Sequence, residues 1–299
     1  CNCDNMKYID DFIKYLDVVR KYSNYTLINY RKDIEDFYDF NTDLLNIDEV
    51  IVREYLQYLY SNNLERRTIS RKLSSLRSFY NYLTKEELID TNYFKDVSNP
   101  KKANVLPHDA KISDIEKIFA IFDIKKCFDE RNLLMLKILY STGIRVGELV
   151  NIKVNDIDFY NCSIKIFGKG AKERIVFFSD DILNSINHYL KTGRIAILKN
   201  KQSEFLFINK NGEKISTRFV RKIIDDVSNR CMIEYNITPH TFRHTFATQM
   251  LKNGADLMSV KELLGHSSIN TTSIYTHLSN EQIRNVYNFA HPRSRSNKE

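Results

Sequence analysis

Residues 163–178 read SIKIFGKGAKERIVFF, two short runs in which apolar and polar residues alternate, joined by a turn with two glycines. Alternation with a period of two is typical of half-buried strands, and a glycine-containing turn between such runs predicts a β-hairpin. A shorter run, FLFIN at 205–209, stands before an Asn-Gly turn and predicts one more strand. The sequence therefore predicts a small antiparallel sheet.

Helical patterns flank this hairpin on both sides, with apolar residues three and four positions apart. We expect helices at 113–122, 129–141, 145–152, 180–198, 217–231, 239–253, 256–265, 268–275 and 280–289. Gly143, Gly254 and Gly265 stand where helix ends need a left-handed residue. With only 8 Gly and 4 Pro, the composition also argues against a turn-rich all-β fold. The expected fold class is mainly α with a small antiparallel β-sheet.

A second helical unit precedes this one. The first of its four expected helices covers 7–22, and the second follows a cap at Ser23 and Thr26. The third helix begins at Asp48 and the fourth at Thr68. Two prolines and two lysines then interrupt the helical pattern in SNPKKANVLPH, and a chain of 299 residues is itself long enough for two domains. We expect an N-terminal helical domain over 1–97, a linker over 98–108 and a second domain over 109–299.

The charge is distributed unevenly between these domains. The whole chain has 45 Lys and Arg against 38 Asp and Glu, a formal net charge of +7. Residues 1–100 hold 14 basic and 17 acidic side chains, so the remaining 31 and 21 give residues 101–299 a net charge of +10. A basic domain is typical of proteins that bind polyanions, because Lys and Arg release counterions from phosphates. A solvated basic surface is the alternative explanation.

Two features limit the cellular setting. No apolar run approaches the roughly 20 residues of a membrane-spanning helix, so we expect no membrane partner. The five cysteines are scattered and odd in number, without the spacing of a disulfide framework or a zinc site. This usage favours a reducing compartment, and we expect a cytoplasmic protein without a signal peptide.

The helix expected from Thr68 concentrates the cations of the acidic N-terminal domain. Between residues 65 and 80, Glu65 is accompanied by five cations: Arg66, Arg67, Arg71, Lys72 and Arg77. Long cations at helical spacing suit phosphate contacts and entry into the major groove of DNA. We therefore expect this helix to contact DNA, with a merely exposed amphipathic helix as the alternative.

Three clusters in the second domain hold groups able to act on a phosphate. In STGIRVGEL at 141–149, Arg145 and Glu148 share a helical face, so Glu148 can support Arg145. Lys169 lies at the tip of the predicted hairpin. The third cluster is spread over TPHTFRHT at 238–245, LLGHS at 263–267 and IYTH at 274–277. Taken singly, each cluster also has a structural explanation, such as a surface ion pair, a polar hairpin tip or a buried histidine.

Together the clusters supply two guanidiniums, two imidazoles, an ammonium and a phenol, from Arg145, Arg243, His240, His266, Lys169 and Tyr275. No acidic group with metal-site spacing and no P-loop is apparent, which argues against two-metal nuclease chemistry and nucleotide hydrolysis. The set fits a metal-free attack on a phosphodiester. A phenol can be the covalent nucleophile, arginines can clamp the phosphoryl oxygens, and a lysine can protonate the departing oxygen.

These residues resemble the signature of the tyrosine recombinase (phage integrase) family: Arg145 in TGIRVGEL, Lys169 in GKGAKER, His240 and Arg243 in HTFRHTFAT, His266 in LLGHSS and Tyr275 in TSIYTH. The resemblance covers nearly the whole chain. The N-terminal helices resemble that family's core-binding (SAM-like) domain, with RTISRKLSSLRSFYNYL as its DNA-contacting helix. The compact length and the ending NEQIRNVYNFAHPR are most similar to the Xer site-specific recombinases, especially the XerC type.

The resemblance implies a role for each matching residue. Tyr275 would attack the scissile phosphate to form a 3′-phosphotyrosyl link, and Lys169 would protonate the departing 5′ oxygen. The phosphoryl oxygens would be bound by Arg145, Arg243 and His266, proton transfer would be assisted by His240, and Glu148 would support the site. DNA contacts are expected from Arg66, Arg67, Arg71, Lys72, Arg77, Lys172 and Arg174. No metal, ATP or other cofactor is implied.

The resemblance also implies partners. Four protomers, identical or of two kinds, would act on two duplexes with a dif-like site through a Holliday junction. The partners of an Xer protein would be a XerD-like sister recombinase and an FtsK-like DNA translocase. The helix near 280–289 would dock on a neighbouring protomer through Ile283, Val286, Tyr287 and Phe289, or alternatively close on its own domain.

Three other functions stay open at this point. The first is an integrase or excisionase of a phage, plasmid or transposon, which shares the same core. The second is a type IB topoisomerase, which shares the Arg, Lys, His and Tyr chemistry. The third is a DNA-binding protein that cuts nothing, which the presence of all six principal residues disfavours. The DNA target is left open as well, because base readout depends on which side chains reach the base edges.

Overall fold

The computed structural model describes residues 2–100, 110–168, 173–265 and 280–292. The chain divides into two compact units, Cys1–Leu106 and Pro107–Glu299. The linker expected over 98–108 lies mostly outside the described residues, so the boundaries at 97 and 109 stay predictions. Among the described residues, no helix is both long and apolar enough to cross a membrane.

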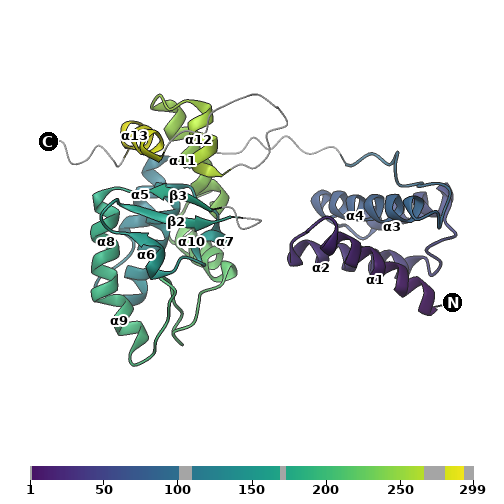
Figure 1. Ribbon diagram of the computed structural model, residues 1–299, viewed down its shortest axis with the longest axis horizontal. Helices are drawn as coiled ribbons and strands as arrows, with labels where there is room; N and C mark the ends of the chain where they lie inside the picture. Colours follow the sequence, from purple (N-terminus) through teal and green to yellow (C-terminus); the bar gives the residue numbers. More distant parts are fainter. Residues whose placement is uncertain (1, 101–109, 169–172, 266–279, 293–299) are drawn as a thin grey trace. The chain divides into compact units, whose positions relative to one another are not determined.

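The described part of the N-terminal unit contains the helices α1 (Asn2–Val18), α2 (Asn24–Phe40), α3 (Glu49–Ser61) and α4 (Arg66–Lys85), as Figure 1 shows. The side chains of Ser23 and Asp48 cap α2 and α3 by accepting hydrogen bonds from backbone amides one turn later, as the sequence predicts. The fourth helix starts before the expected Thr68, because the Ile69 amide already donates to the Glu65 carbonyl.

Aromatic side chains fill the core between these helices. The ring of Phe37 meets those of Tyr55, Tyr80 and Phe94 edge to face, with centroids 4.7, 6.1 and 5.4 Å apart. This geometry is favourable because the positive ring edge meets the negative ring face. The Tyr80 hydroxyl also donates to the Leu44 carbonyl at 3.0 Å. The unit therefore has a hydrophobic core of its own, which fixes α4 against α2 and α3.

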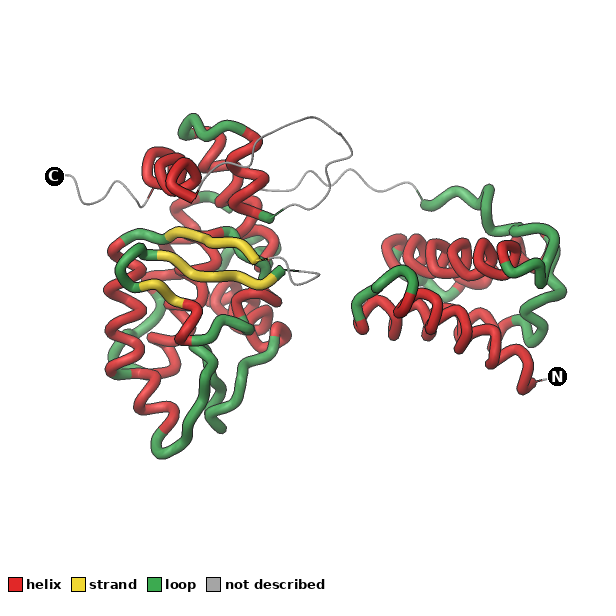
Figure 2. Tube along the Cα trace, viewed as in Figure 1, coloured by secondary structure: helices red, strands yellow, loops and turns green. Residues whose placement is uncertain are grey.

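The second unit is mainly helical with a small sheet among the residues that the structure describes (Figure 2). Its helices are α5 (Ile112–Ala120), α6 (Cys127–Thr142), α7 (Val146–Leu149), η1 (Val154–Asp156), α8 (Asp180–Lys191), α9 (Gly193–Leu198), α10 (Thr217–Arg230), α11 (Pro239–Lys252), α12 (Leu257–Leu264) and α13 (Asn280–Ala290). The antiparallel sheet has the order β1 (Ile157–Asp158), β2 (Ser163–Phe167) and β3 (Glu173–Phe177). The predicted fold class and hairpin are confirmed, while β1 was not predicted.

The strand expected at 205–209 is wrong, since this segment forms only isolated bridges within the described residues. Arg194 donates to the Phe205 carbonyl at 2.9 Å, and Arg131 donates to the Ile208 carbonyl at 2.7 Å. Arginine side chains thus satisfy backbone groups that a neighbouring strand would otherwise have to satisfy.

The helix expected over 180–198 is interrupted, and Thr192 separates α8 from α9. The Thr192 hydroxyl donates to the buried carboxylate of Glu130 at 3.1 Å. A Cβ on Gly193 would lie 2.2 Å from an oxygen of the same carboxylate, so a side chain there would have to displace Glu130. The helix expected over 145–152 is the single turn α7, and the one expected over 268–275 lies outside the described residues.

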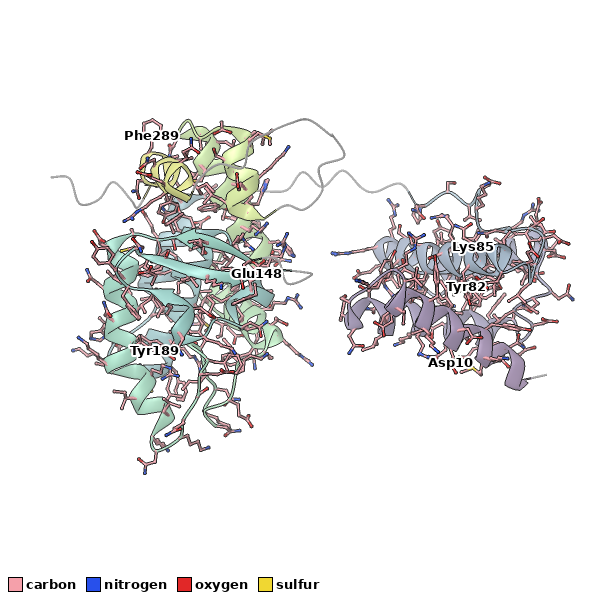
Figure 3. The ribbon with its side chains drawn as sticks, in the orientation of Figure 1. Asp10, Tyr82, Lys85, Glu148, Tyr189 and Phe289 are labelled. Atoms are coloured by element: carbon pink, nitrogen blue, oxygen red, sulfur yellow. The ribbon has the colours of Figure 1, made fainter. Side chains whose placement is uncertain are left out.

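The last helix, α13, packs on its own unit, which agrees with the alternative expectation, while its docking on a neighbouring protomer stays a prediction. Ile283 and Tyr287 are buried in a cluster with side chains of α11 and α12, and Val286 packs against it. The Asn253 side-chain amide donates to the Ala290 carbonyl at 2.7 Å and closes the end of the helix. Most of the apolar face of α13 is therefore covered by its own unit, and Phe289, labelled in Figure 3, is 61 % exposed.

Candidate active site

Two helix ends from distant parts of the chain converge on Arg243. One guanidinium nitrogen donates to the Gly143 carbonyl at the end of α6, and another donates to the Leu264 carbonyl at the end of α12, both at 2.6 Å. The last carbonyls of a helix lack partners within the helix and carry partial negative charge, so they suit a buried cation. The sequence spacing of 100 and 21 residues gives no local signal for this convergence.

The convergence requires glycine at position 143. Its φ of +62° is left-handed, and a Cβ there would lie 2.5 Å from Phe246 Cδ1 and 2.9 Å from a methyl carbon of Leu264. Backbone conformation and close packing therefore both exclude a side chain at this position.

We expect Gly143→Ala to destabilise the second unit by about 2–4 kcal/mol, because left-handed backbone strain adds to overpacking of the core. Gly147→Ala is the matched control, since a Cβ at Gly147 would meet no atom within 4 Å. Chemical denaturation of the two variants would test this, and equal unfolding midpoints would contradict the packing explanation.

Burial lowers the pKa of Arg243 to about 10, and the nearby charge of Arg145 adds to this effect. The guanidinium is still protonated at neutral pH because this pKa lies well above 7. Arg243 therefore offers a permanent, largely desolvated positive charge, which interacts more strongly with a phosphate than an exposed arginine would.

Glu148 connects Arg145 to this position. Its carboxylate accepts a hydrogen bond from the Arg145 amide at 2.7 Å and another from the Arg145 guanidinium at 3.1 Å. A further guanidinium nitrogen of Arg145 donates to the Gly265 carbonyl at 3.3 Å, next to the carbonyl that Arg243 binds. The predicted support of Arg145 by Glu148 is thus present in the structure, although Arg145 remains partly exposed.

Arg174 completes the support. Two of its guanidinium nitrogens bind the two oxygens of Glu148 at 2.9 and 2.8 Å, and Nε donates to the Leu263 carbonyl at 3.3 Å. A Cβ on Gly265 would lie 3.0 Å from the Arg174 side chain, so this glycine leaves room for it. Three of the five N–H donors of Arg174 thus act inside the unit, and its expected contact with DNA stays a prediction.

Burial alone would raise the pKa of Glu148, but hydrogen bonds and positive charge from Arg174 and Arg145 outweigh it, and the pKa is lowered. The carboxylate is therefore ionised at neutral pH. Its negative charge offsets one of the three surrounding guanidiniums and leaves a net positive site. Such a site stabilises the additional negative charge of a phosphoryl transition state.

His240 stands one helical turn before Arg243 on α11. Thr238 caps the helix by accepting a hydrogen bond from the Thr241 amide at 3.2 Å, and Pro239 occupies the first helical position. His240 is exposed, so a bound substrate can reach it. The structure thus brings together Arg145, Glu148 and Arg243, with His240 on the same helix. Lys169, Lys172, His266 and Tyr275 lie outside the described residues.

The cations of α4 have different surroundings. Lys72 is buried and pairs with Asp36 and with Asp33, at 3.6 Å from the latter. Its expected contact with DNA stays a prediction that these ion pairs do not favour. Arg77 donates to the Val97 carbonyl at 2.8 Å and holds the segment that follows the helix. Its DNA contact, and those of the exposed Arg66 and Arg67 and the half-buried Arg71, stay predictions.

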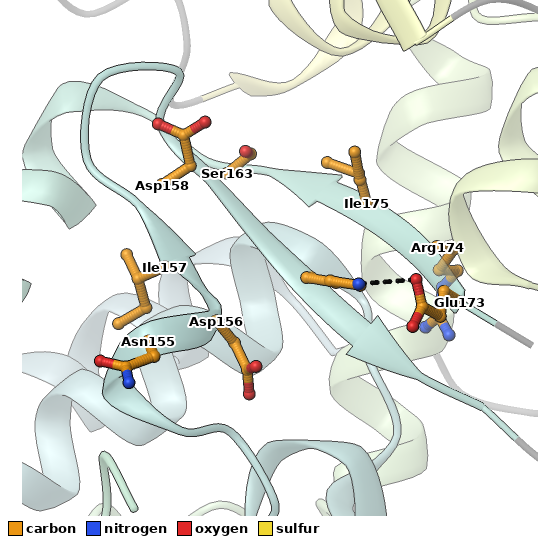
Figure 4. A pocket seen from close by; sticks show the side chains of 9 residues that line it. Asn155, Asp156, Ile157, Asp158, Ser163, Glu173, Arg174 and Ile175 are labelled. Atoms are coloured by element: carbon orange, nitrogen blue, oxygen red, sulfur yellow. Dashed lines mark ion pairs between the residues drawn. The ribbon is translucent and has the colours of Figure 1, made fainter. Parts of the chain in front are cut away.

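A hollow of about 560 Å³ lies over the outer face of the sheet (Figure 4). Its lining includes Asp156, Asp158 and the ion pair between Lys165 and Glu173, which are 2.7 Å apart. Arg174 also borders the hollow, but its guanidinium binds Glu148 on the other side. The hollow is therefore separate from the arginine cluster that suits a phosphate.

The guanidiniums of Arg145 and Arg243 lie near one buried carboxylate in a mainly helical unit, and an N-terminal helical unit precedes it in the sequence. This arrangement suits a protein that binds a phosphodiester. Residues 111–282 match the Phage integrase family, and residues 9–87 match the Phage integrase, N-terminal SAM-like domain. The chain belongs to the phage integrase family of tyrosine recombinases, enzymes that cut and rejoin DNA.

Similar proteins extend over nearly the whole chain. A tyrosine recombinase XerC of Anoxybacillus flavithermus is 39 % identical over 290 residues, covering 95 % of this chain and 97 % of that protein. One of Staphylococcus aureus is 41 % identical over 300 residues, covering 98 % and 100 %.

Solved structures are similar as well. The XerH site-specific recombinase bound to difH in a pre-cleavage complex is 25 % identical, covers 94 % of this chain and 83 % of its own, and has a TM-score of 0.66. A lambda integrase dimer bound to a COC′ core site is 20 % identical, covers 92 % and 99 %, and has a TM-score of 0.70. The latter likeness concerns the fold alone.

Proposed function

We propose that this enzyme recombines DNA at a specific site by using Tyr275 as its nucleophile. The observation that carries the proposal is that the guanidiniums of Arg145 and Arg243 bind carbonyls at the ends of α6 and α12. The carboxylate of Glu148 binds Arg145 at the same place. Two guanidiniums on adjacent carbonyls can bind two non-bridging oxygens of one phosphate. No proton has to move for this binding, since both groups are already charged.

In the proposed reaction, the Tyr275 oxygen bonds to the scissile phosphorus and the bond to the 5′ oxygen breaks. The phenol proton passes to a base, for which His240 is the candidate, and Lys169 donates a proton to the departing 5′ oxygen. His266 joins the arginines on the phosphoryl oxygens. A 5′-hydroxyl then attacks the phosphotyrosyl bond and releases the tyrosine, so the link is conserved without ATP. Two rounds of exchange make and resolve a Holliday junction.

We further propose that the enzyme acts in the cytoplasm on a dif-like chromosomal site and resolves chromosome dimers. The full-length similarity to proteins named XerC, and to a XerH structure solved on difH, supports this role. A tetramer on two duplexes is the expected assembly, with a XerD-like sister and an FtsK-like translocase as the expected partners. DNA would be contacted by Arg66, Arg67, Arg71 and Arg77 of α4 and by Lys172.

Sequencing the DNA held in the covalent adduct would test the biological role. A dif-like chromosomal sequence is the expected result, whereas attachment sites of a phage, plasmid or transposon would favour an integrase. Relaxation of a supercoiled plasmid that lacks the recovered site would favour a type IB topoisomerase. If the wild-type protein forms no adduct, the result would favour a DNA-binding protein that does not cleave DNA.

Lys169→Ala is expected to slow cleavage by about 10²–10⁴-fold, because the departing 5′ oxygen loses its general acid. A substrate with sulfur at the 5′-bridging position should restore the rate, since a thiolate leaves without a proton. Single-turnover cleavage of both substrates measures this, with Lys191→Ala on the exposed face of α8 as the control. A variant that stays equally slow on the sulfur substrate would exclude Lys169 as the acid.

A further inference from the structure

Asp33 of α2 is fully buried in the N-terminal unit although its side chain is a carboxyl group. Its Oδ2 accepts hydrogen bonds from the Arg71 guanidinium and from the Ser75 hydroxyl, the latter at 2.8 Å. Lys72 lies 3.6 Å from Oδ1. All three partners belong to α4, the helix with the expected DNA contacts. A buried carboxylate is costly unless it is paired, so Asp33 favours a single arrangement of α2 and α4.

Arg71 lies within the outward face of α4. Residues three and four apart share a helical face, so Arg67, Ser70, Arg71 and Ser74 form one polar stripe, and all four are exposed or half-buried. The Arg71 side chain keeps 39 % of its surface exposed while one of its nitrogens binds Asp33. A guanidinium is planar with five N–H donors in a fixed geometry, so anchoring one nitrogen restricts the direction of the others.

We propose that Asp33 is a positioning residue that orients Arg71 for contact with the DNA site. This inference rests on the proposed DNA contact of α4. Holding Arg71 before DNA arrives reduces the rotamer freedom that a long side chain loses on binding. Lys72 is held between Asp33 and Asp36 and supplies the buried positive charge that allows Asp33 to stay inside the unit. Asp33 thus acts on DNA recognition through Arg71 and has no contact of its own with DNA.

Asp33→Asn in the full-length protein tests the inference. Binding is measured to a duplex with the site recovered from the covalent adduct and to a duplex of the same composition in shuffled order. The affinity for the site is expected to fall about tenfold, because a charge-assisted contact loses its geometry. The affinity for the shuffled duplex should hardly change, since it depends mainly on the total cationic charge, which the variant leaves in place.

The decisive measurement is the same substitution in an Arg71→Ala background. If Asp33 acts through Arg71, adding Asp33→Asn there causes no further loss of site affinity. An equal tenfold loss in both backgrounds would overturn the inference and assign Asp33 a purely structural role. Unfolding temperatures are measured alongside, because a structural role would lower stability in both backgrounds without moving the site preference.

Two further variants distinguish a loss of orientation from a loss of folding. Arg71→Lys keeps the positive charge at a half-buried position but loses the planar guanidinium. It should therefore lose the preference for the site over the shuffled duplex. A wild-type preference in this variant would refute the role of orientation. Asp10→Asn breaks an exposed ion pair between α1 and α2, Asp10 with Arg31 at 2.5 Å, and should change neither affinity (Figure 3). A wild-type protein that binds both duplexes equally would overturn the proposed function, and the inference with it.

Discussion

Phenylalanine at position 275 is expected to leave DNA binding intact and to abolish the covalent adduct. The phenol oxygen of Tyr275 is the atom proposed to bond to phosphorus, and a phenylalanine ring has no atom that could replace it. Adduct formation should fall by more than about 10⁴-fold, the scale seen when an enzyme loses its nucleophile. The measurement is trapping on a suicide substrate with a nick near the cleavage site, followed by denaturing gel electrophoresis.

Tyr160→Phe is the matched control for Tyr275→Phe. Tyr160 belongs to the same unit and is 92 % exposed in the turn between β1 and β2. The control is expected to form the adduct at the wild-type rate, since it removes a hydroxyl of the same kind from a solvent-exposed position. A covalent adduct in Tyr275→Phe would mean that another residue is the nucleophile, and peptide mapping of that adduct would identify it.

Arg243→Lys is expected to give the second large effect. The guanidinium spans the carbonyls of Gly143 and Leu264, whereas a single ammonium cannot reproduce both bonds and also present a second face to a phosphate. Cleavage should slow by about 10²–10³-fold, as when one donor to a developing charge is removed. The stability of the second unit should fall by about 1–3 kcal/mol, because a buried carbonyl loses its partner.

Single-turnover cleavage and thermal unfolding separate these two consequences of Arg243→Lys. Rates are compared at a temperature at which both proteins are folded. Arg53→Lys on α3 makes the same exchange at an exposed position and should alter neither quantity. If folded Arg243→Lys cleaves within a few-fold of the wild type, the proposed clamp on the phosphate is wrong.

Features with local signals could be predicted from the sequence. The hairpin at 163–178 follows from alternation around a glycine-containing turn, and the caps Ser23 and Asp48 follow from short polar side chains before helical patterns. The left-handed Gly143 and Gly265 likewise follow from helix ends. In each case the residues that determine the conformation are neighbours along the chain.

Other features of the structure arise where distant groups compete with the local pattern. The helix over 180–198 breaks at Thr192 because Glu130 of α6 binds its hydroxyl. Lys72 has the helical spacing of a surface cation, yet its side chain is buried because it pairs with the carboxylates of Asp33 and Asp36 on α2. Arg174 is a cation on a hairpin strand in the sequence, and only the tertiary structure shows that its guanidinium binds Glu148 of α7.

The ordered set of Arg145, Lys169, His240, Arg243, His266 and Tyr275 is enough to predict the chemistry, because a reaction needs particular functional groups and the sequence shows which ones are present. Their arrangement is a different matter. Arg243 reaches the carbonyls of α6 and α12 only because its own helix, α11, packs against both of them. Glu148 is ionised inside the unit only because two arginines surround it. Such long-range pairing depends on the burial of many side chains at once, which no short stretch of sequence encodes.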